Sequence, residues 1–455
     1  MKRPTSYIIG ILGFILILGS ILFLTRIFES EKPILEIKGL SEYICSPARI
    51  FVSISDKNMG LKKIEIILVQ KNKKAIILRR NFPKLDILNT KGTHEFHKII
   101  IFDPLKLGLS DGKAILKICA IDYSLRNRGK GNITILKKDV IVDTTPPNIT
   151  PISKLNYFYI GGSGLLIYEV SKDTVKTGIY VNNLFFPAYI INTPSKYGDY
   201  YACYIGIPYY IKEPVDIHIW AKDKAGNSST ANFYYRIKRK IFRKRKIIIT
   251  DSFLKKVLPF FSRYPFNSKD NMIQRFLKIN RDLRKKNAAF IKSLISKTSK
   301  KRLWKGAWVY LKDSLCTARF GDHRSYFYKG KLIDHQVHLG IDLASIANSP
   351  IPATNNGKII FCGRLGIYGF SVIIDHGQGI FSLYGHMSRI DVKQGQFVKK
   401  GDIIGITGQT GLAGGDHLHF SILINGIFVN PEEWLDYHWL KDNIIRKLKM
   451  VGGYK

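Results

Sequence analysis

Apolar residues follow several different patterns along this chain of 455 residues, and the first pattern is a continuous run. Residues Tyr7–Leu24 are eighteen uncharged and mostly apolar residues. At 1.5 Å per residue this run is near the lower limit for crossing a hydrocarbon core of about 30 Å. Lys2 and Arg3 precede it, which favours a cytoplasmic N-terminus. A cleaved signal peptide is the competing interpretation, but no A-x-A site follows, so we predict an uncleaved membrane anchor within residues 1–29.

Short runs with alternating apolar and polar positions fill the next two regions. In residues 30–147, runs such as ARIFVSISD and KKIEIILVQ are rich in β-branched residues and predict strands. Residues 148–237 show the same pattern after the extended linker Asp143–Pro147. KICAID (Lys117–Asp122) matches HIWAKD (His218–Asp223) at an offset of 101 residues. A repeat of this size predicts two immunoglobulin-like β-sandwich modules, which we interpret as spacers rather than ligand-binding modules.

Residues 238–303 change to a basic and then a helical pattern. The run Lys238–Lys246 contains seven charges in nine residues and predicts a solvated linker. The pattern of residues 268–296 predicts a helical hairpin that packs on the last domain, with Ser268 as the N-cap. We further hypothesise that this segment partly covers the groove of that domain. The apolar residues on the predicted helical face are Met272, Ile273, Phe276, Leu277 and Leu283.

The last region, residues 304–440, alternates glycine-rich turns with short apolar runs such as GFSVIID and GIFSLYGHM. This pattern predicts an antiparallel β-rich domain, followed by a basic tail at residues 441–455. The predicted fold class is therefore mainly β. It combines an N-terminal transmembrane helix, two sandwich modules, a helical linker and this last domain.

Composition adds two constraints. Lys and Arg number 72 and Asp and Glu 34, so the formal net charge is 72 − 34 = +38, which favours an anionic partner. Nucleic acid is not expected, because the charge is spread along the chain without a nucleic-acid motif and the anchor places most of the chain outside the cytoplasm. The five cysteines are odd in number and lack C-x-x-C spacing, which excludes a disulfide framework and a thiolate zinc site. They are Cys45, Cys119, Cys203, Cys316 and Cys362.

Histidines gather in the last region, where eight of the eleven lie between His323 and His438. His417 and His419 in GDHLHF are two residues apart, so both point to the same side of a strand. If both histidines were in the core, each imidazole would need its own buried hydrogen-bond partners. This requirement argues against a purely structural role for the pair. In HLGID, a straight strand would hold His338 and Asp342 about 13 Å apart, too far for one ion, so the chain must bend between them.

The motifs HLGID, YGHM and GDHLHF, in this order, resemble the lysostaphin-type (LytM-like) zinc metallopeptidases. The framework GQFVKKGDIIGITGQTGLAGGDHLHF and the later VNPEEW continue the resemblance. It implies that His338, Asp342 and His419 hold one zinc ion, which leaves a fourth position for water. It also implies that His417 and His386 flank this water and the scissile carbonyl. His417 would act as general base, and His386, if protonated, would stabilise the oxyanion.

Two departures from the family pattern are Met387, where Leu is usual, and FSILING, where an acidic residue often follows HLHF. We expect neither departure to touch a metal ligand. Other histidines receive simpler interpretations: His376 as a structural hydrogen-bonding residue, His335 as exposed, and His94–His97 as part of a strand. The stretch Phe320–Arg324 is interpreted equally as groove lining or as a surface turn.

The resemblance implies a membrane-anchored zinc metalloendopeptidase that hydrolyses the peptide cross-links of bacterial peptidoglycan with a zinc-activated water. Its expected partners are peptidoglycan and, through the N-terminal helix, the bacterial inner membrane, with the catalytic domain on the periplasmic side. One alternative is a non-catalytic or regulatory wall-binding protein that activates another hydrolase. Another is a secreted protease that acts on proteins. All three ligand positions and both further histidines are present, which favours the enzyme, with or without a protein activator.

Overall fold

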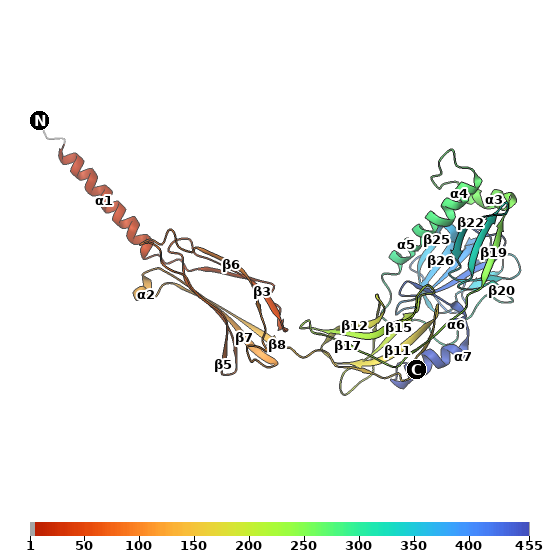
Figure 1. Ribbon diagram of the computed structural model, residues 1–455, viewed down its shortest axis with the longest axis horizontal. Helices are drawn as coiled ribbons and strands as arrows, with labels where there is room; N and C mark the ends of the chain where they lie inside the picture. Colours follow the sequence, from red (N-terminus) through yellow and green to blue (C-terminus); the bar gives the residue numbers. More distant parts are fainter. Residues whose placement is uncertain (1–4, 455) are drawn as a thin grey trace. The chain divides into compact units, whose positions relative to one another are not determined.

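The computed structural model describes residues 5–454, which divide into two compact units (Figure 1). One unit comprises the chain up to Pro147 together with Lys222–Ser228, and the other comprises Asn148–Ala221 and the chain from Ser229 onward. Strands dominate both units, so the mainly β class is confirmed. All five cysteines are free thiols in this structure.

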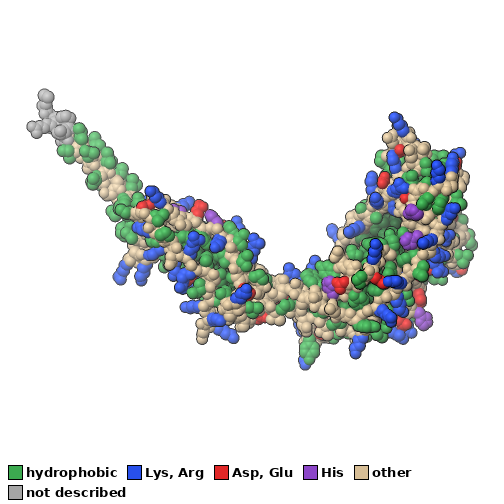
Figure 2. Space-filling model, in the orientation of Figure 1, with side chains coloured by type: hydrophobic (Ala, Val, Ile, Leu, Met, Phe, Trp, Pro, Cys, Tyr) green, Lys and Arg blue, Asp and Glu red, His purple; other side chains and the backbone are tan. Residues whose placement is uncertain are grey.

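The first unit begins with a long apolar helix and continues as two sheets that share one core. The helix α1 (Thr5–Ile27) contains the one segment of residues 5–454 that is long and apolar enough to cross a membrane, Tyr7–Ile27. Figure 2 shows apolar side chains along the surface of this helix. One sheet has the strand order β1-β3-β6 and the other β2-β8-β7-β4-β5. Their bounds are β1 (Ile34–Lys38), β2 (Tyr43–Ile44), β3 (Ala48–Ser55), β4 (Leu61–Gln70), β5 (Lys73–Asn81), β6 (Glu95–Phe102), β7 (Gly112–Asp122) and β8 (Ile133–Val142).

The helix α1 is joined directly to the sandwich that follows it. The backbone N–H of Leu125 donates to the carbonyl of Ile27 at 2.9 Å, and the N–H of Met59 donates to the Glu29 carboxylate at 3.1 Å. Asn132 donates through its side chain to the Glu29 carbonyl at 3.1 Å. These bonds satisfy the carbonyls and the carboxylate at the end of the helix, so the helix continues into the folded unit without a spacer.

The second unit begins with another pair of sheets. One has the order β14-β15-β11-β9 and the other β13-β12-β16-β17. The strand β11 is buried along almost its whole length and β15 over its last five residues, so both faces of this sheet are covered. The two-sheet architecture agrees with the predicted sandwich, while an immunoglobulin-like topology stays a prediction. The bounds are β9 (Ile149–Pro151), β11 (Ser163–Val170), β12 (Thr174–Val181), β13 (Leu184–Pro187), β14 (Tyr189–Ile191), β15 (Asp199–Gly206), β16 (Ile217–Asp223) and β17 (Ser228–Ala231).

A large antiparallel sheet forms the C-terminal part of this unit and confirms the predicted antiparallel domain. Its strand order is β20-β23-β31-β27-β26-β25-β29. The short helices α6 (Pro431–Leu435), α7 (Tyr437–Leu440) and α8 (Arg446–Met450) follow it. The strand bounds are β20 (Leu315–Ala318), β23 (Ile341–Ala344), β25 (Gly357–Arg364), β26 (Phe370–Asp375), β27 (Ile380–Met387), β29 (Phe397–Val398) and β31 (Leu418–Ile424).

The segment between these two parts differs from the prediction in three respects. Residues 244–249 are not a linker but the strand β19 (Lys244–Ile249), which pairs in parallel with β21 (His323–Tyr328). The helical residues after α3 (Asp251–Val257) are not a hairpin, because one run continues from Met272 to Leu294 through a π-helical turn. The N-cap is Asn271 rather than Ser268, since its side chain accepts from the Gln274 N–H in a reciprocal capping box. The run comprises α4 (Met272–Lys278), the turn Ile279–Leu283 and α5 (Arg284–Leu294).

The second sandwich and the C-terminal sheet share one hydrophobic cluster. Glu433 of α6 accepts from the Ser163 backbone N–H at 2.8 Å and from its hydroxyl at 3.1 Å. Trp434 donates to the same hydroxyl at 3.0 Å. Lys447 of α8, which lies in the predicted basic tail, donates to the Asn156 side chain at 2.9 Å. The tail is therefore helical at this point and packs on the sandwich.

Glu433 allows a test of this interface through the pH dependence of stability. Burial raises the pKa of Glu433 to about 7, above its ordinary value of 4.5. The folded state therefore binds a proton more tightly than the unfolded state, and this carboxyl lowers stability as pH rises from about 4.5 to about 7. The Glu433→Gln variant keeps an acceptor for Ser163. We expect it to remove this pH-dependent decrease in the free energy of unfolding, which amounts to roughly 3 kcal/mol at most.

Urea unfolding of the wild type and the variant at pH 5 and pH 8 measures this difference. Glu432→Gln is the matched control, since Glu432 is its more exposed neighbour. An identical pH dependence for wild type and Glu433→Gln would contradict the assignment.

Candidate metal centre

Two neighbouring strands and the bend before one of them bring three candidate ligands together. Asp342 on β23 pairs directly with His419 on β31, so their side chains lie next to each other. Leu418 and Phe420 point into the core with exposed fractions of 2% and 1%, which leaves His419 on the opposite face. His338 lies just after β22 (Lys331–Val337) and reaches the same point. The prediction that the chain bends between His338 and Asp342 is confirmed, because β22 and β23 are separate strands.

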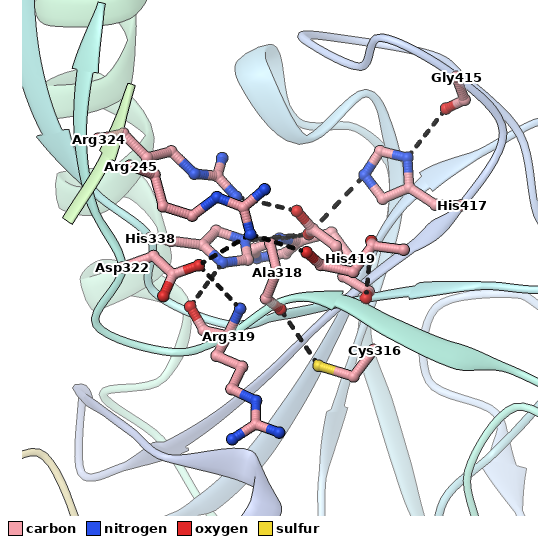
Figure 3. A network of polar contacts seen from close by, with 12 residues as sticks. Arg245, Cys316, Ala318, Arg319, Asp322, Arg324, His338, Gly415, His417 and His419 are labelled. Atoms are coloured by element: carbon pink, nitrogen blue, oxygen red, sulfur yellow. Dashed lines mark hydrogen bonds and ion pairs between the residues drawn. The ribbon is translucent and has the colours of Figure 1, made fainter. Parts of the chain in front are cut away.

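The three candidate ligand atoms converge on one point, and Figure 3 shows His338 and His419 within this network of polar contacts. His338 Nε2 is 2.9 Å from Asp342 Oδ1 and 3.1 Å from His419 Nδ1. His419 Nδ1 is 3.0 Å from the same carboxylate oxygen. Ligand atoms at 2.0–2.1 Å from a tetrahedral zinc ion would be about 3.3 Å apart. The spacing therefore fits a single small cation.

The hydrogen bonds on the outer nitrogens of the two histidines suit a bound cation. His338 Nδ1 lies 3.0 Å from the Arg319 carbonyl, which can only accept, so this nitrogen carries the proton. His419 Nε2 lies 3.0 Å from the Ser421 hydroxyl, whose own proton goes to the Leu339 carbonyl at 2.8 Å. The opposite nitrogens of both rings are then unprotonated. Two lone pairs and a carboxylate oxygen face one another, an arrangement that a bound metal ion satisfies.

Gly340 is required for close packing rather than for its backbone angles. A Cβ at this position would lie 2.5 Å from the Phe420 carbonyl, 2.6 Å from the Ser421 hydroxyl and 2.7 Å from a His419 ring carbon. Any side chain would therefore displace His419. This glycine therefore lets the bend pass directly over the ligand.

His417 and His386 lie beside the three candidate ligands. The His386 ring is 4.8 Å from the His417 ring and 5.8 Å from the His419 ring, measured between centroids. His417 donates from Nδ1 to the Gly415 carbonyl at 2.9 Å, and His386 from Nδ1 to the Thr410 carbonyl at 2.8 Å. The Nε2 lone pair of each ring is therefore free to face the centre. His417 Nε2 is 3.7 Å from Asp342 Oδ1.

His386 adopts an unusual backbone conformation. The residue before it, Gly385, pairs with His419, so strict alternation would turn the His386 side chain to the other face of the sheet. A φ of +63°, in the left-handed region, instead turns it toward the centre. Such a backbone angle is uncommon outside glycine and is found at functional sites. The side chain is buried, with an exposed fraction of 7%.

Burial and charge set the protonation of the site. Burial lowers the pKa of His419 to about 4, and it lowers the pKa of His386 well below its ordinary value, with His417 and His419 adding to the effect. Burial would raise the pKa of Asp342, but His338 and His419 outweigh it and hold this pKa well below its ordinary value. Around neutral pH, His419 and His386 are therefore neutral and Asp342 is ionised.

Arg324 is a site residue that the motifs did not identify. Its guanidinium donates to Asp342 Oδ2 at 3.0 Å, on the side of the carboxylate away from the histidines. This bond leaves Oδ1 to face the candidate metal position. Arg324 belongs to the stretch Phe320–Arg324, in which Phe320 and Asp322 are buried, so the stretch is not merely a surface turn. Sequence spacing offers no sign of a bond to a residue 18 positions later.

Ser421 corrects the expectation that neither departure from the family pattern touches a metal ligand. This residue follows Phe420 in FSILING, and its hydroxyl bonds to the candidate ligand His419. The alternation of β31 explains the contact, because Ser421 is two residues after His419 and shares its face.

A cavity of about 260 Å³ opens over the centre. Its walls come partly from the segment before the last domain, in agreement with the hypothesis that this segment covers the groove. Lys256 of α3 also donates to the Gly414 carbonyl at 2.8 Å and so ties this segment to the loop that precedes His417. Outside the five histidine-motif residues, the lining comprises Ile247, Ile248, Ile249, Phe253, Phe276, Arg284, Arg324, Tyr326, Ile367, Tyr368, Leu412 and Gly414.

The remaining histidine predictions hold where the structure bears on them. His376 is fully buried and bonds to the Asn356 carbonyl at 2.8 Å and the Ser382 hydroxyl at 2.7 Å, which confirms its structural role. His335 is exposed, as predicted. His97 lies in strand β6, and His94 directly precedes it.

Comparison with known proteins identifies the region that holds the centre. Residues 336–431 match the family model described as peptidase family M23. The DD-carboxypeptidase/endopeptidase Mpg of Neisseria meningitidis is 44% identical over 96 residues, which are 21% of this chain and 22% of that protein. The peptidoglycan DD-endopeptidase ShyA of Vibrio cholerae is 36% identical over 93 residues, 20% of this chain and 22% of that protein. The chain thus spans about a fifth of the length of these curated relatives.

Solved structures also align with this chain. The catalytic domain of lysostaphin from Staphylococcus simulans is 28% identical and covers 27% of this chain and 92% of its own, with a TM-score of 0.24. A zinc-containing peptidase from Vibrio cholerae is 15% identical and covers 94% of this chain and 96% of its own, with a TM-score of 0.26.

Ser421 gives a test of the hydrogen bonds around the candidate ligands. Removing a partner of this kind commonly weakens metal binding about 10- to 100-fold. We expect Ser421→Ala to weaken zinc binding about tenfold. Ser421→Thr keeps the hydroxyl and should retain the wild-type affinity. Competition with a zinc chelator of known affinity measures both variants, and equal affinities for Ser421→Ala and wild type would show that the bond does not orient His419.

Proposed function

We propose that the M23 peptidase domain at the C-terminus of this chain is a zinc-dependent endopeptidase that hydrolyses peptide cross-links of bacterial peptidoglycan. The observation that carries the proposal is the convergence of His338, Asp342 and His419 on one point, with two further histidines beside it. Relatives over the same region are DD-endopeptidases by name, which supports the reaction class.

The residues fit zinc by their chemistry. Two imidazole nitrogens and one carboxylate oxygen are a common catalytic zinc set, and three protein ligands leave a position open. His338 Nε2, Asp342 Oδ1 and His419 Nδ1 would hold the ion. When bound, zinc supplies Lewis acidity, which makes water a nucleophile near neutral pH and polarises a carbonyl.

His417 is the residue we assign as general base. Its Nε2 lone pair points to the centre because Nδ1 donates its proton to the Gly415 carbonyl. In the proposed reaction Nε2 takes a proton from the attacking water while the water oxygen bonds to the carbonyl carbon of the cross-link. The C–N bond then breaks, and the proton passes from Nε2 to the departing amine. General acid–base catalysis of this kind contributes typically about 10²–10⁴-fold.

His386 receives a different role from the one expected from the resemblance. Its Nδ1–H is used by the Thr410 carbonyl, so the neutral ring presents a lone pair at Nε2 rather than a donor. Burial among His417 and His419 opposes a second proton by lowering its pKa. We therefore assign His386 to accepting a hydrogen bond from the attacking water and so orienting it, not to donating to an oxyanion.

The location of the substrate agrees with the N-terminal helix. An apolar helix that crosses the bacterial inner membrane would place residues after α1 in the periplasm, next to the wall. The positive charge of the chain suits a wall that carries carboxylates. A regulatory wall-binding role is not favoured, because no member of the ligand set or of the histidine pair is missing.

Digestion of purified sacculi tests the proposal. Full-length protein in detergent, with and without a zinc chelator, should release fragments that mass spectrometry identifies as separated cross-links. Loss of this release with the chelator is the expected result. A protein that contains zinc and releases nothing, even after addition of periplasmic extract, would contradict the endopeptidase proposal and favour the regulatory alternative.

Two substitutions separate metal binding from proton transfer. His338→Ala should lose zinc and turnover together, since it removes a ligand. His417→Ala should keep zinc and lose about 10²-fold or more of its turnover. Metal content by mass spectrometry and initial rates on sacculi measure the two effects. Near-wild-type turnover of His417→Ala would show that the base is another group.

A further inference from the structure

The charges that line the cavity are unbalanced. Asp342 is its one carboxylate, while Arg284 and Arg324 contribute two guanidinium groups. The Oδ1 atom of Asp342 faces the histidines and its Oδ2 atom faces Arg324. Both oxygens of this carboxylate therefore already have partners. A divalent cation at the centre would add further positive charge. The cavity therefore has an excess of positive charge, which an anionic group of a bound molecule would neutralise.

Arg324 donates to Asp342 at the centre, whereas Arg284 bonds to Asn280 instead. Arg284 donates from Nε to the Asn280 carbonyl at 3.2 Å and from Nη2 to the Asn280 side-chain oxygen at 2.8 Å. Asn280 is uncharged and fully buried, and its amide donates to Asp334 at 2.7 Å. A guanidinium has five N–H groups, so Arg284 keeps donors for another partner.

Asp334, the acid that Asn280 contacts, is matched by a different arginine. Asp334 receives the Arg281 guanidinium at 3.0 Å in addition to the Asn280 amide. Arg281 thus balances the charge of Asp334 at the edge of the helix. Asn280 contacts both Asp334 and Arg284 and so holds the Arg284 side chain in place. Because Asn280 is uncharged, it does not neutralise the positive charge of the Arg284 guanidinium.

The helix places Arg284 beside the catalytic end of the cavity. Arg284 and Asn287 of α5 are three residues apart and so share a helix face. Asn287 accepts from the Ile367 N–H at 3.0 Å, which packs this face against the turn before Tyr368. The Tyr368 ring is 5.3 Å from the His419 ring. Burial raises the pKa of Tyr368, and the Arg284 guanidinium opposes this rise, as expected for a neighbouring positive charge.

We propose that Arg284 is a specificity-determining residue that binds a carboxylate carried by the substrate next to the amide bond that is cleaved. This inference rests on the proposed endopeptidase function and names the class of cross-link that it would act on. A direct cross-link to a diamino acid has a carboxylate on the carbon beside the cleaved amide nitrogen. A bridge of glycine residues has no charge at that place and would leave Arg284 unpaired.

Arg284 belongs to α5, outside the residues that match the family model. The preference for a charged substrate would thus come from the helical segment that covers the cavity, while the metal ligands come from the matched domain. Planar guanidinium groups bind carboxylates through two parallel hydrogen bonds, which a lysine cannot reproduce.

Two cross-linked muropeptide dimers test this inference, one with the free carboxylate and one with the same group converted to a carboxamide. For the full-length protein in detergent, we expect the free-carboxylate dimer to have a kcat/KM at least about tenfold higher, as for a charge-assisted hydrogen bond. Arg284→Gln should bring the ratio close to one by slowing cleavage of the charged dimer alone. Arg284→Lys should retain part of the preference.

Lys285→Gln is the matched control, because Lys285 is exposed on the same helix and changes the net charge equally. It should keep the wild-type ratio. Zinc content and the thermal midpoint of each variant show that the fold is intact. Equal rates for both dimers in the wild type, or a ratio that survives in folded Arg284→Gln, would overturn the inference.

Binding separates this inference from the proposed function. Calorimetry with the His417→Ala variant measures the affinity for each dimer without cleavage. Tighter binding of the free-carboxylate dimer by His417→Ala supports the inference if this preference is lost in the double variant His417→Ala with Arg284→Gln. This holds even if the wild type cleaves neither dimer. Failure of the wild type to cleave either dimer would refute only the endopeptidase function. Equal binding of the two dimers by His417→Ala overturns the inference.

Discussion

Two imidazole lone pairs and a carboxylate oxygen held about 3 Å apart are the constraint around which the C-terminal sheet is organised. Such a set is repulsive without a cation, so other contacts have to hold each group in place. The Arg319 carbonyl and the Ser421 hydroxyl fix the two rings, and Arg324 fixes the carboxylate. Each of these partners satisfies the side of a ligand that faces away from the centre. These partners thus orient all three candidate ligands through the protein itself.

The sheet and the segment before it contribute different properties to the cavity. The strands β23, β27 and β31 supply Asp342, His386 and His419, because paired strands hold neighbouring side chains at a fixed spacing. His338 and His417 come from the segments just after β22 and just before β31. The strand β19 and the helices α3, α4 and α5 supply apolar walls and a guanidinium. Low polarity in the walls strengthens the electrostatic interactions at the centre. Under the proposed function, substitutions in the walls can change selectivity without touching the candidate ligands.

Sequence reasoning predicted the site better than its surroundings. The family resemblance carried by HLGID and GDHLHF implied His338, Asp342 and His419 as ligands, and the structure brings these three side chains together. Arg324 and Arg284 could not be predicted, since their contacts join residues far apart in sequence through ordinary surface-type side chains. The hairpin was wrong because a π-helical turn at Ile279–Leu283 continues the helix without any glycine or proline to mark it. The strand β19 was missed because its charged residues match a solvated linker as well as an edge strand.

The hydrophobic cluster shared by the second sandwich and the C-terminal sheet has a consequence for how this architecture can evolve. Glu433 and Trp434 bond to Ser163, and Lys447 bonds to Asn156, so polar contacts as well as apolar ones cross the boundary. Recombination between genes succeeds most readily where few contacts cross a junction. A crossover between this sandwich and the sheet would leave both new chains with an unmatched apolar face and a buried charge without a partner. We therefore expect the second sandwich and the C-terminal sheet to be inherited together.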